Sequence, residues 1–405
     1  MTTSNKRKII NDPVYGFITI PSEEIYELIQ SPYIQRLRRI KQLGLSNLVY
    51  PGAEHTRFSH SIGAMYLMTQ ALDVLRSKGE QITDEEYSAA LQAILLHDCG
   101  HAPFSHCLEG YFFDVCHEDL SVQFMKDLGV NSMVIDIFTD KYKKRFLHAL
   151  VSSQVDTDRL DYLTRDSFFT GVSEGVIGTE RILKMFSVHN DELVIDEKGV
   201  YSIEKFIISR RLMYWQVYMH KTVVAADCLL RNILKRAKCL AENNALKENE
   251  YPISRHLLYF LKNGVRPVTD QEALQHYLLL DDTDIWSCVK IWSTHTDKVL
   301  SFLSAKLVNR EIGKMEVVTA DYTLEDLEQR HNALCKKYEG EFSKQEVLDY
   351  FCSNGEMHNR AYSFNDNQIN ILYKNGQIKE IYEASDQLDK NFLSKEIKKY
   401  YYFQI

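Results

Sequence analysis

The sequence predicts a mainly α protein with small β-hairpin additions and a C-terminal α+β region. Apolar residues recur at helical spacing through most of the first 247 residues. Residues 11–20 and 191–203 contain short β-prone runs, and Asn375-Gly376 between two apolar runs is a strong hairpin signal. Hydrophobic residues make up 45% of the 405 positions and charged residues 26%, which is typical of a folded globular chain.

The expected helices can be placed in chain order. Their apolar spacing covers residues 22–44, 60–79, 83–98, 120–128 and 146–165. Thr83 and Glu86 have the spacing of a capping box, and the Ala- and Leu-rich run behind them predicts a buried helix. A hairpin turn is expected around Glu197–Gly199, followed by one long helix or two successive helices over residues 203–244. Beyond about Glu248 the helical signals become shorter and more polar.

Charge and cysteine content narrow the class of protein. The formal net charge of −8 argues against general binding to a nucleic-acid backbone, and the basic run Lys141–Arg145 is interpreted as a solvated face. No apolar run reaches the roughly 18 residues that suggest a membrane span. The eight cysteines form no Cys-x-x-Cys pair, so free thiols in a reducing compartment are expected. We therefore expect a cytoplasmic protein with no membrane partner and no nucleic-acid partner.

The stretch LLHDCGHAPFSH, Leu95–His106, predicts chemistry at the end of a buried helix. His97 and Asp98 directly follow an apolar run, where burying a carboxylate is costly unless a cation or hydrogen-bond donors compensate. A histidine nitrogen and an aspartate oxygen together suit Mn, Fe, Zn, Co or Ni. His60 and the acidic segment 156–166 could complete such a site. A helix-capping pair and a solvated acidic helix face are the alternatives that these residues leave open.

Five stretches together resemble the HD-domain metal-dependent phosphohydrolases, in their deoxynucleoside triphosphate triphosphohydrolase branch. They are INDPVYGFI, QRLRRIKQLG, PGAEHTRFSHSIG, HDCGHAPFSH and VDTDRLDYLTRD. That branch includes the sterile-alpha-motif and HD-domain dNTPase and its bacterial relatives, and the resemblance covers about Lys8–Lys221. It implies an HD-domain helical bundle as a catalytic domain over residues 1–247, with its metal-binding core at about 50–170. Residues 248–405 would be a C-terminal helical region with a β-hairpin, for which lid, oligomer interface and partner-binding surface remain open.

The resemblance also implies individual roles. The metal ligands would be His60, His97, Asp98 and Asp158, with Asp156 the nearest competitor for the place of Asp158. His55 and Asp161 would support the ligands. His101, His106 and His117 would move protons, with Glu109 as a partner of one histidine and the division of acid and base left open. The substrate contacts would be Gln42, Arg57, Arg159, Tyr162, Asp166, Arg210, Tyr218 and Lys221.

The implied reaction is metal-dependent hydrolysis of deoxynucleoside triphosphates at the α-phosphate, giving deoxynucleoside and inorganic triphosphate. A divalent transition metal (Fe, Mn, Zn, Co or Ni) would be the cofactor, and Mg²⁺ on the substrate phosphates is a further candidate. Two alternatives are kept. One is an HD phosphohydrolase for a nucleoside monophosphate, a cyclic nucleotide or a signalling nucleotide. The other is a non-catalytic nucleotide sensor or nucleic-acid-binding module that has kept the fold, although the net acidity argues against general nucleic-acid binding.

Regulation is the last expectation from the resemblance. Relatives form oligomers, so a homodimer or homotetramer is expected, and Lys8, Gln35 and Arg38 match parts of an activator site between subunits. Gln30 stands where the animal enzyme has a guanine-reading acid. An amide offers one acceptor where a carboxylate offers two, so guanine-specific activation is not expected, and a different nucleotide activator or none is left open.

Overall fold

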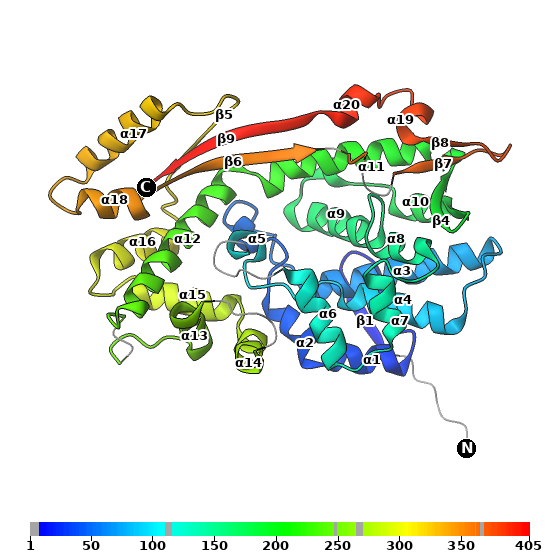
Figure 1. Cartoon of the computed structure of the whole chain (residues 1–405), viewed down its shortest axis with the longest axis horizontal. Helices are drawn as coiled ribbons and strands as arrows, with labels where there is room; N and C mark the ends of the chain where they lie inside the picture. The colour runs from blue at the N-terminus through cyan, green and yellow to red at the C-terminus, as the bar shows by residue number, and fades with distance from the viewer. Residues whose placement is uncertain (1–7, 110–115, 247–248, 265–269, 361, 365–367) are drawn as a thin grey trace, which may run out of the picture.

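The computed structural model describes residues 8–109, 116–246, 249–264, 270–360, 362–364 and 368–405. It confirms the mainly α fold with small sheets (Figure 1). The helices of the first half are α1 (Glu23–Gln30), α2 (Pro32–Arg36), α3 (Arg57–Ser77), α4 (Asp84–Leu96), α5 (Ser105–Leu108), α6 (His117–Asp127), α7 (Ser132–Phe138), α8 (Arg145–Val151), α9 (Thr157–Thr170) and α10 (Thr179–Met185). Short 3-10 helices at Leu37–Arg39 and Gly44–Leu48 lead into α3.

The second half continues with helices and with most of the strands. Its helices are α11 (Val200–Met213), α12 (Lys221–Glu242), α13 (Arg255–Asn263), α14 (Gln271–Leu279), α15 (Asp282–Trp292), α16 (Lys298–Val308), α17 (Leu324–Lys337), α18 (Lys344–Tyr350), α19 (Ile381–Ala384) and α20 (Lys390–Ser394). A π-helical turn, Tyr214–Tyr218, separates α11 from α12. The predicted segment 203–244 is therefore two successive helices.

Three small sheets complete the fold. Their strands are β1 (Ile9–Asp12), β2 (Gly16–Thr19), β3 (Phe186–His189), β4 (Glu192–Asp196), β5 (Lys314–Val318), β6 (Cys352–Arg360), β7 (Asn370–Leu372), β8 (Ile378–Glu380) and β9 (Glu396–Gln404). They form the pair β1-β2, the sheet β3-β4-β7-β8 and the sheet β5-β9-β6. The Asn375-Gly376 hairpin is confirmed as the antiparallel pair β7-β8. In Figure 1 the long strands β6 and β9 run along one edge of the molecule, beside α11 and α12.

Three sequence-based element predictions were wrong in detail. The helical segment expected over residues 146–165 is divided into α8 and α9, because Ser152 and Asp156 have extended backbone and Asp156 caps a new helix. The single helix expected over residues 22–44 is divided at Ser31, because Pro32 has no N–H to continue the hydrogen-bond ladder and begins α2 instead. The hairpin expected around Glu197–Gly199 turns at Asn190-Asp191, where both residues have positive φ (52° and 63°) as a type I′ turn requires. Glu197–Gly199 is a 3-10 turn that leads into α11.

The C-terminal end of helix α4 lies in the interior of the molecule. Its N-terminus has the predicted capping box, in which Thr83 Oγ1 accepts from the Glu86 N–H at 3.1 Å and Glu86 Oε2 accepts from the Thr83 N–H at 2.9 Å. Apolar side chains are buried around most of the helix, which ends at Leu96 and is followed by His97 as its C-terminal capping residue. Helix α3 packs against both α4 and α9. Side chains from these three helices therefore meet in the protein interior.

Residues on both sides of position 247 share a sheet, since β4 pairs in parallel with β7. The division into 1–247 and 248–405 stays a prediction. Among the residues that the structure describes, no helix has the length and apolar character needed to cross a membrane.

Candidate metal centre and active site

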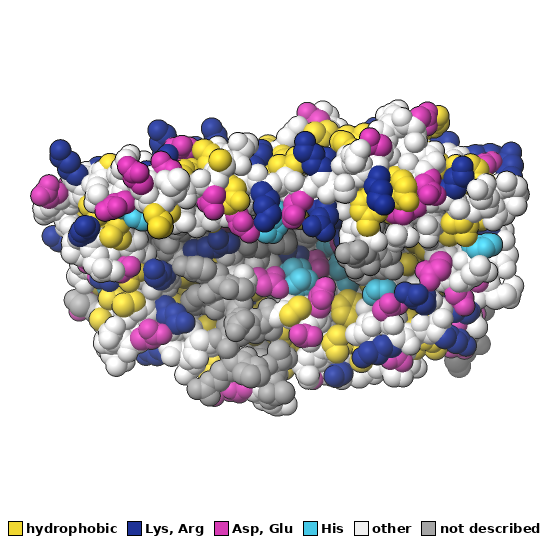
Figure 2. Space-filling model, turned by 45° about the horizontal axis from the view of Figure 1, so that its top comes forward, with side chains coloured by type: hydrophobic (Ala, Val, Ile, Leu, Met, Phe, Trp, Pro, Cys, Tyr) yellow, Lys and Arg dark blue, Asp and Glu magenta, His cyan; other side chains and the backbone are white. Residues whose placement is uncertain are grey.

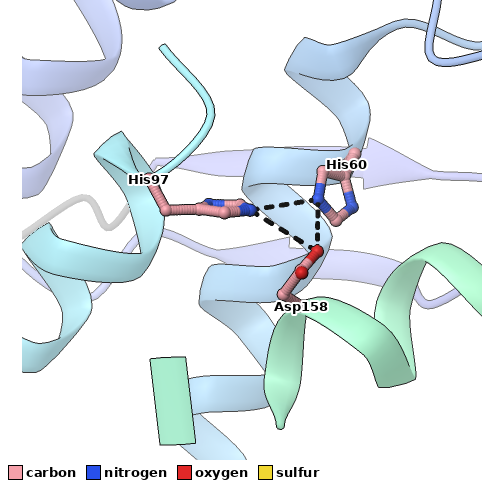
Figure 3. A group of neighbouring side chains, drawn as sticks. All are labelled: His60, His97 and Asp158. Atoms are coloured by element: carbon pink, nitrogen blue, oxygen red, sulfur yellow. Dashed lines mark hydrogen bonds and ion pairs between the residues drawn. The ribbon is translucent and has the colours of Figure 1, made fainter. Parts of the chain in front are cut away.

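The predicted metal ligands come together from three helices (Figure 3). His60 lies in the first turn of α3, His97 caps the C-terminal end of α4, and Asp158 lies in the first turn of α9. His60 Nε2 is 3.3 Å from His97 Nε2 and 3.1 Å from Asp158 Oδ1, and His97 Nε2 is 3.5 Å from the same oxygen. Asp98 joins them, with Oδ1 3.4 Å from His97 Nε2 and Oδ2 3.7 Å from His60 Nε2.

Second contacts orient both imidazoles toward this point. Nδ1 of His60 lies 2.7 Å from Asp161 Oδ2, and Nδ1 of His97 lies 2.6 Å from the carbonyl oxygen of Ile94. Because each Nδ1 faces an acceptor, it would carry the proton of the neutral ring, and a metal ion that replaces any second proton would meet the lone pair of each Nε2. Histidine ligands of metals characteristically have this outer hydrogen bond. Two imidazole nitrogens and carboxylate oxygens around one point fit a divalent transition metal.

The electrostatics of the cluster favour a positive charge. Burial lowers the pKa of His60, but its hydrogen bonds with Asp158 and Asp161 outweigh burial and raise that pKa to about 10. Burial raises the pKa of Asp158, yet the two histidines hold it below its usual value. Carboxylates that draw a proton onto a buried imidazole would also favour a divalent cation between them.

A chain of ion pairs fixes Asp161 behind His60. Arg165, one turn along α9, binds Asp161 through two nitrogens at 2.9 and 3.0 Å and reaches Asp12 on β1 at 2.8 Å. All three side chains are buried. Gly63 lies against this group, since a Cβ at that position would stand 2.1 Å from Asp161 Oδ1 and 2.2 Å from Arg165 Nη2. Residue 63 therefore has to be glycine for the ion pair to reach His60.

Replacing Gly63 with alanine is expected to weaken metal binding roughly 10–100-fold, the usual effect of losing an outer partner of a ligand. The added methyl group displaces Asp161 and frees the His60 ring, and overpacking lowers stability by about 1–3 kcal/mol. Metal titration and thermal unfolding measure the two effects. Gly178→Ala is the matched control, because a Cβ there meets nothing nearer than 3.9 Å. Equal metal affinity in both variants would contradict the prediction.

Arg57 and Asp98 form a buried ion pair at the N-terminus of α3. Arg57 Nη1 donates to Asp98 Oδ2 at 2.6 Å, and Arg57 is only 2% exposed. Burial raises the pKa of the Asp98 carboxyl, but His97, His101 and Arg57 together hold it well below its usual value. The predicted phosphate contact, Arg57, thus also positions a predicted metal ligand.

The predicted proton-transfer residues stand on the other side of Asp98. His101 Nε2 lies 3.2 Å from Asp98 Oδ1, and the His101 and His117 rings stack with centroids 3.9 Å apart. Glu109 Oε1 lies 2.6 Å from His117 Nδ1 and also accepts from the His117 N–H. Burial lowers the pKa of His117, while the Glu109 contact raises it by more. His106 belongs to α5, but its side chain lies outside the described residues.

Gly100 allows this arrangement. A Cβ there would stand 2.1 Å from the carbonyl oxygen of His117, so the start of α6 packs directly on the backbone of the loop after α4. Tight contact at this point keeps the His117 ring over His101.

A cavity of about 370 Å³ lies next to α9, and several of the residues that were predicted to contact substrate line it. Gln42, Tyr162, Asp166 and Tyr218 all line it. Asp166 is held by His55 Nε2 at 2.7 Å and by the Tyr218 hydroxyl, which donates at 2.8 Å. The Gln42 Oε1 atom is buried without a hydrogen-bond partner among the described residues. On the face shown in Figure 2, histidine and acidic side chains gather near the middle of the molecule.

The three remaining basic residues that were predicted to contact substrate do not line this cavity. They are Arg159, Arg210 and Lys221. Arg159 donates to the Ser153 carbonyl oxygen at 2.5 Å and lies 3.4 Å from the Tyr162 hydroxyl. Burial raises the pKa of Tyr162, and the positive charges of Arg159 and Arg210 oppose that shift. Lys221 is exposed and lines a separate depression with Trp215 and neighbouring residues, not the 370 Å³ cavity.

The structure places the two competing aspartates differently. Asp156 caps α9, where its two carboxylate oxygens accept from the backbone N–H groups of Ser153 and Arg159 at 2.6 Å each. Asp158 directs an oxygen into the histidine cluster. Asp156 therefore acts as an ordinary N-cap residue, whose side chain accepts hydrogen bonds from backbone N–H groups, and Asp158 is free of that role.

The predicted activator residues lie on the surface near α1 and α2. Lys8 pairs with Glu23 at 3.3 Å, and Arg38 donates to Gln35 Oε1 at 3.0 Å. Gln30 is exposed at the end of α1. These contacts are also those of an ordinary solvated face, so the activator role stays a prediction.

Sequence reasoning missed some residues that build the site. Asp12 was recognised only as part of a turn, although it anchors Arg165. Asp227 of α12 lines the cavity, where burial raises its pKa to about 7. No local signal distinguishes either residue, because Asp12 acts through the distant Arg165 and Asp227 faces a cavity that several segments of the chain build together.

Comparisons with known proteins identify the family of this chain. Residues 177–251 match a family described as an HD-associated region. The uncharacterized protein YwfO of Bacillus subtilis is 33% identical over 399 aligned positions, and the alignment covers 94% of this chain and 88% of that protein. The crystal structure of a phosphohydrolase from Bacteroides thetaiotaomicron is 48% identical, with a TM-score of 0.93 and coverage of 99% of this chain and all of that one.

A more distant similarity concerns the human deoxynucleoside triphosphate triphosphohydrolase SAMHD1. It is 28% identical over 298 aligned positions, and the alignment covers 61% of this chain. The matched part is 47% of the human protein, so the chain spans about half the length of that relative.

Proposed function

The chain belongs to the HD phosphohydrolase family, with similarity to the deoxynucleoside triphosphate triphosphohydrolases, and from this premise we propose that it hydrolyses deoxynucleoside triphosphates at the α-phosphate. The products would be deoxynucleoside and inorganic triphosphate. One observation carries the proposal: the metal-ligand cluster and the 370 Å³ cavity share helix α9. Asp158, Tyr162 and Asp166 follow one another at four-residue intervals, so they lie along one face with a rise of about 6 Å per step.

This arrangement suits a nucleotide with its phosphates at the cluster and its sugar and base in the cavity. His60, His97, Asp98 and Asp158 would hold a divalent cation, which would supply Lewis-acid polarisation of a phosphoryl oxygen. The protein supplies the rest. His117 is held by Glu109 at Nδ1, so its other nitrogen can exchange a proton with the reacting phosphate or water. Arg57 provides a fixed positive charge beside the Asp98 carboxylate.

Sugar recognition follows from the polar groups of the cavity. The unpaired Gln42 oxygen and the Asp166 carboxylate can accept hydrogen bonds from a sugar hydroxyl. The Tyr162 ring lies on the same wall. An aromatic ring packed against the sugar would exclude a 2′-hydroxyl by its bulk, which supports a deoxynucleotide over a ribonucleotide.

Incubating the metal-loaded protein with each dNTP is expected to release inorganic triphosphate and deoxynucleoside in equal amounts. Chromatography of the phosphate products measures this, and chelation followed by return of Mn, Fe, Co, Ni or Zn identifies the metal. Release of orthophosphate or pyrophosphate would instead indicate a different HD phosphohydrolase reaction. Nucleotide binding without turnover at any metal would contradict the proposal in favour of a nucleotide sensor.

A further inference from the structure

Two loops that carry proposed active-site residues are tied to the C-terminal half of the chain. The first loop contains Lys41 and Gln42, and the second is the segment His101–Phe104. Asp282, the first residue of α15, accepts from the Lys41 N–H at 2.9 Å and from the Phe104 N–H at 3.2 Å. Its carboxylate thus bonds to both loops at once, one oxygen to each.

The carboxylate is well placed to hold these loops firmly. Asp282 is 4% exposed, and water therefore offers little competition for its two hydrogen bonds. Phe104 has a φ of 49°, which is an unfavourable conformation for a residue with a side chain. A charged acceptor on its N–H stabilises that conformation, because hydrogen bonds to an ionised group are stronger than neutral ones.

Neighbouring residues reinforce the same connection. The Tyr277 hydroxyl of α14 donates to the Gly100 carbonyl oxygen at 2.8 Å. Arg36 donates to the His101 carbonyl oxygen at 2.7 Å and to the Leu280 carbonyl oxygen at 3.3 Å. Backbone groups on both sides of His101 are therefore held by side chains that α14, α15 and α2 contribute.

We propose that Asp282 is a positioning residue for the active site, which fixes the Lys41–Gln42 and His101–Phe104 segments relative to each other. Gln42 faces the cavity and His101 faces Asp98, so the distance between sugar contact and proton-transfer residues depends on this carboxylate. The catalytic meaning of these segments rests on the proposed function. The structural connection itself does not, which allows the two to be tested apart.

The test compares Asp282→Asn with the wild-type full-length chain by hydrogen–deuterium exchange. An asparagine side chain keeps one acceptor oxygen and turns an NH₂ group toward the other N–H. Exchange in peptides covering residues 40–44 and 101–105 is expected to accelerate at least about tenfold, the effect of losing a net hydrogen bond of about 1.4 kcal/mol. Peptides from β6 and β9 should keep their wild-type rates. Unchanged exchange in both loops would overturn the proposal.

Asp297→Asn is the matched control for a general loss of stability. Asp297 is a half-buried N-cap in the same half of the chain, where it accepts from the Leu300 N–H at 2.8 Å and pairs with Arg236 at 2.6 Å. Its substitution should leave exchange in the two loops unaltered. Equal acceleration in both variants would show a merely structural effect and overturn the proposal.

Turnover provides the readout that separates positioning from folding. With metal content unchanged, Asp282→Asn should lower kcat for dNTP hydrolysis roughly 10–100-fold, because small displacements of reacting groups are costly. Accelerated loop exchange with wild-type kcat would overturn the positioning role. If the variant does not fold, Tyr277→Phe probes the same connection, with faster exchange expected at 101–105. If the wild type itself lacks dNTP hydrolysis, the proposed function fails, while the exchange data still decide whether Asp282 holds the loops.

Discussion

Replacing Asp98 with alanine is expected to abolish metal retention and hydrolysis together. Asp98 faces His97 and His101 with one oxygen and receives Arg57 with the other. Its removal takes a predicted ligand directly from the cluster, so the loss of metal affinity should exceed the roughly 10–100-fold cost of losing an outer partner. Elemental analysis after dialysis and an assay of triphosphate release measure the two losses.

The same substitution also leaves the buried Arg57 without its carboxylate. Breaking a buried ion pair in this way costs about 3–5 kcal/mol, so unfolding has to be separated from metal loss. Asp98→Asn keeps the shape of the side chain and an acceptor for Arg57, and it should lose metal while remaining folded by circular dichroism. Asp84→Ala is the matched control at the exposed end of α4, where the side chain is 95% exposed. A folded Asp98 variant that retains a full complement of metal would refute the ligand assignment.

Helices α3 and α4, which carry the predicted ligands His60 and His97, were predictable because their signals are local. The Thr83–Glu86 capping box and the apolar run behind it define α4, and the helical period of residues 60–79 defines most of α3. The site motifs end or begin these helices, so correct helix prediction already places His60 and His97 near helix ends. Local signals were also available for the missed turn, since Asn190-Asp191 favours the positive φ values that are found there.

Other features depend on contacts between distant parts of the chain. Asp161 and Arg165 have the spacing of a helix-surface ion pair, and the structure shows that pair buried behind His60. Nothing within α9 indicates that His60 or Asp12 will complete the chain of contacts. Strand β9 pairs with β5 and β6, which lie far away in sequence, and Asp282 resembles any acidic residue at the start of a helix. Such roles are set by tertiary packing, which helical or strand periodicity does not encode.

Replacing His117 with alanine is expected to slow turnover roughly 10²–10⁴-fold while the metal is retained. The His117 ring stacks on His101 and binds Glu109, and it stands apart from the His60–His97–Asp158 cluster. The loss should therefore appear in kcat, with the metal content of the wild type. Added imidazole should restore part of the rate, because a small base can enter the space left by the ring and transfer the proton.

Two further variants serve as comparisons for His117→Ala. Glu109→Gln should reproduce part of the loss, since it removes the negative charge that raises the pKa of His117 and weakens the contact that orients its ring. His358→Ala, on the exposed face of β6, should leave both rate and metal content unchanged. Loss of metal from the His117 variant would place that imidazole among the ligands. In that case Asp98, His101 and His117, whose ligand atoms lie within 4.8 Å of one another, would have to be considered as a metal-binding group in their own right.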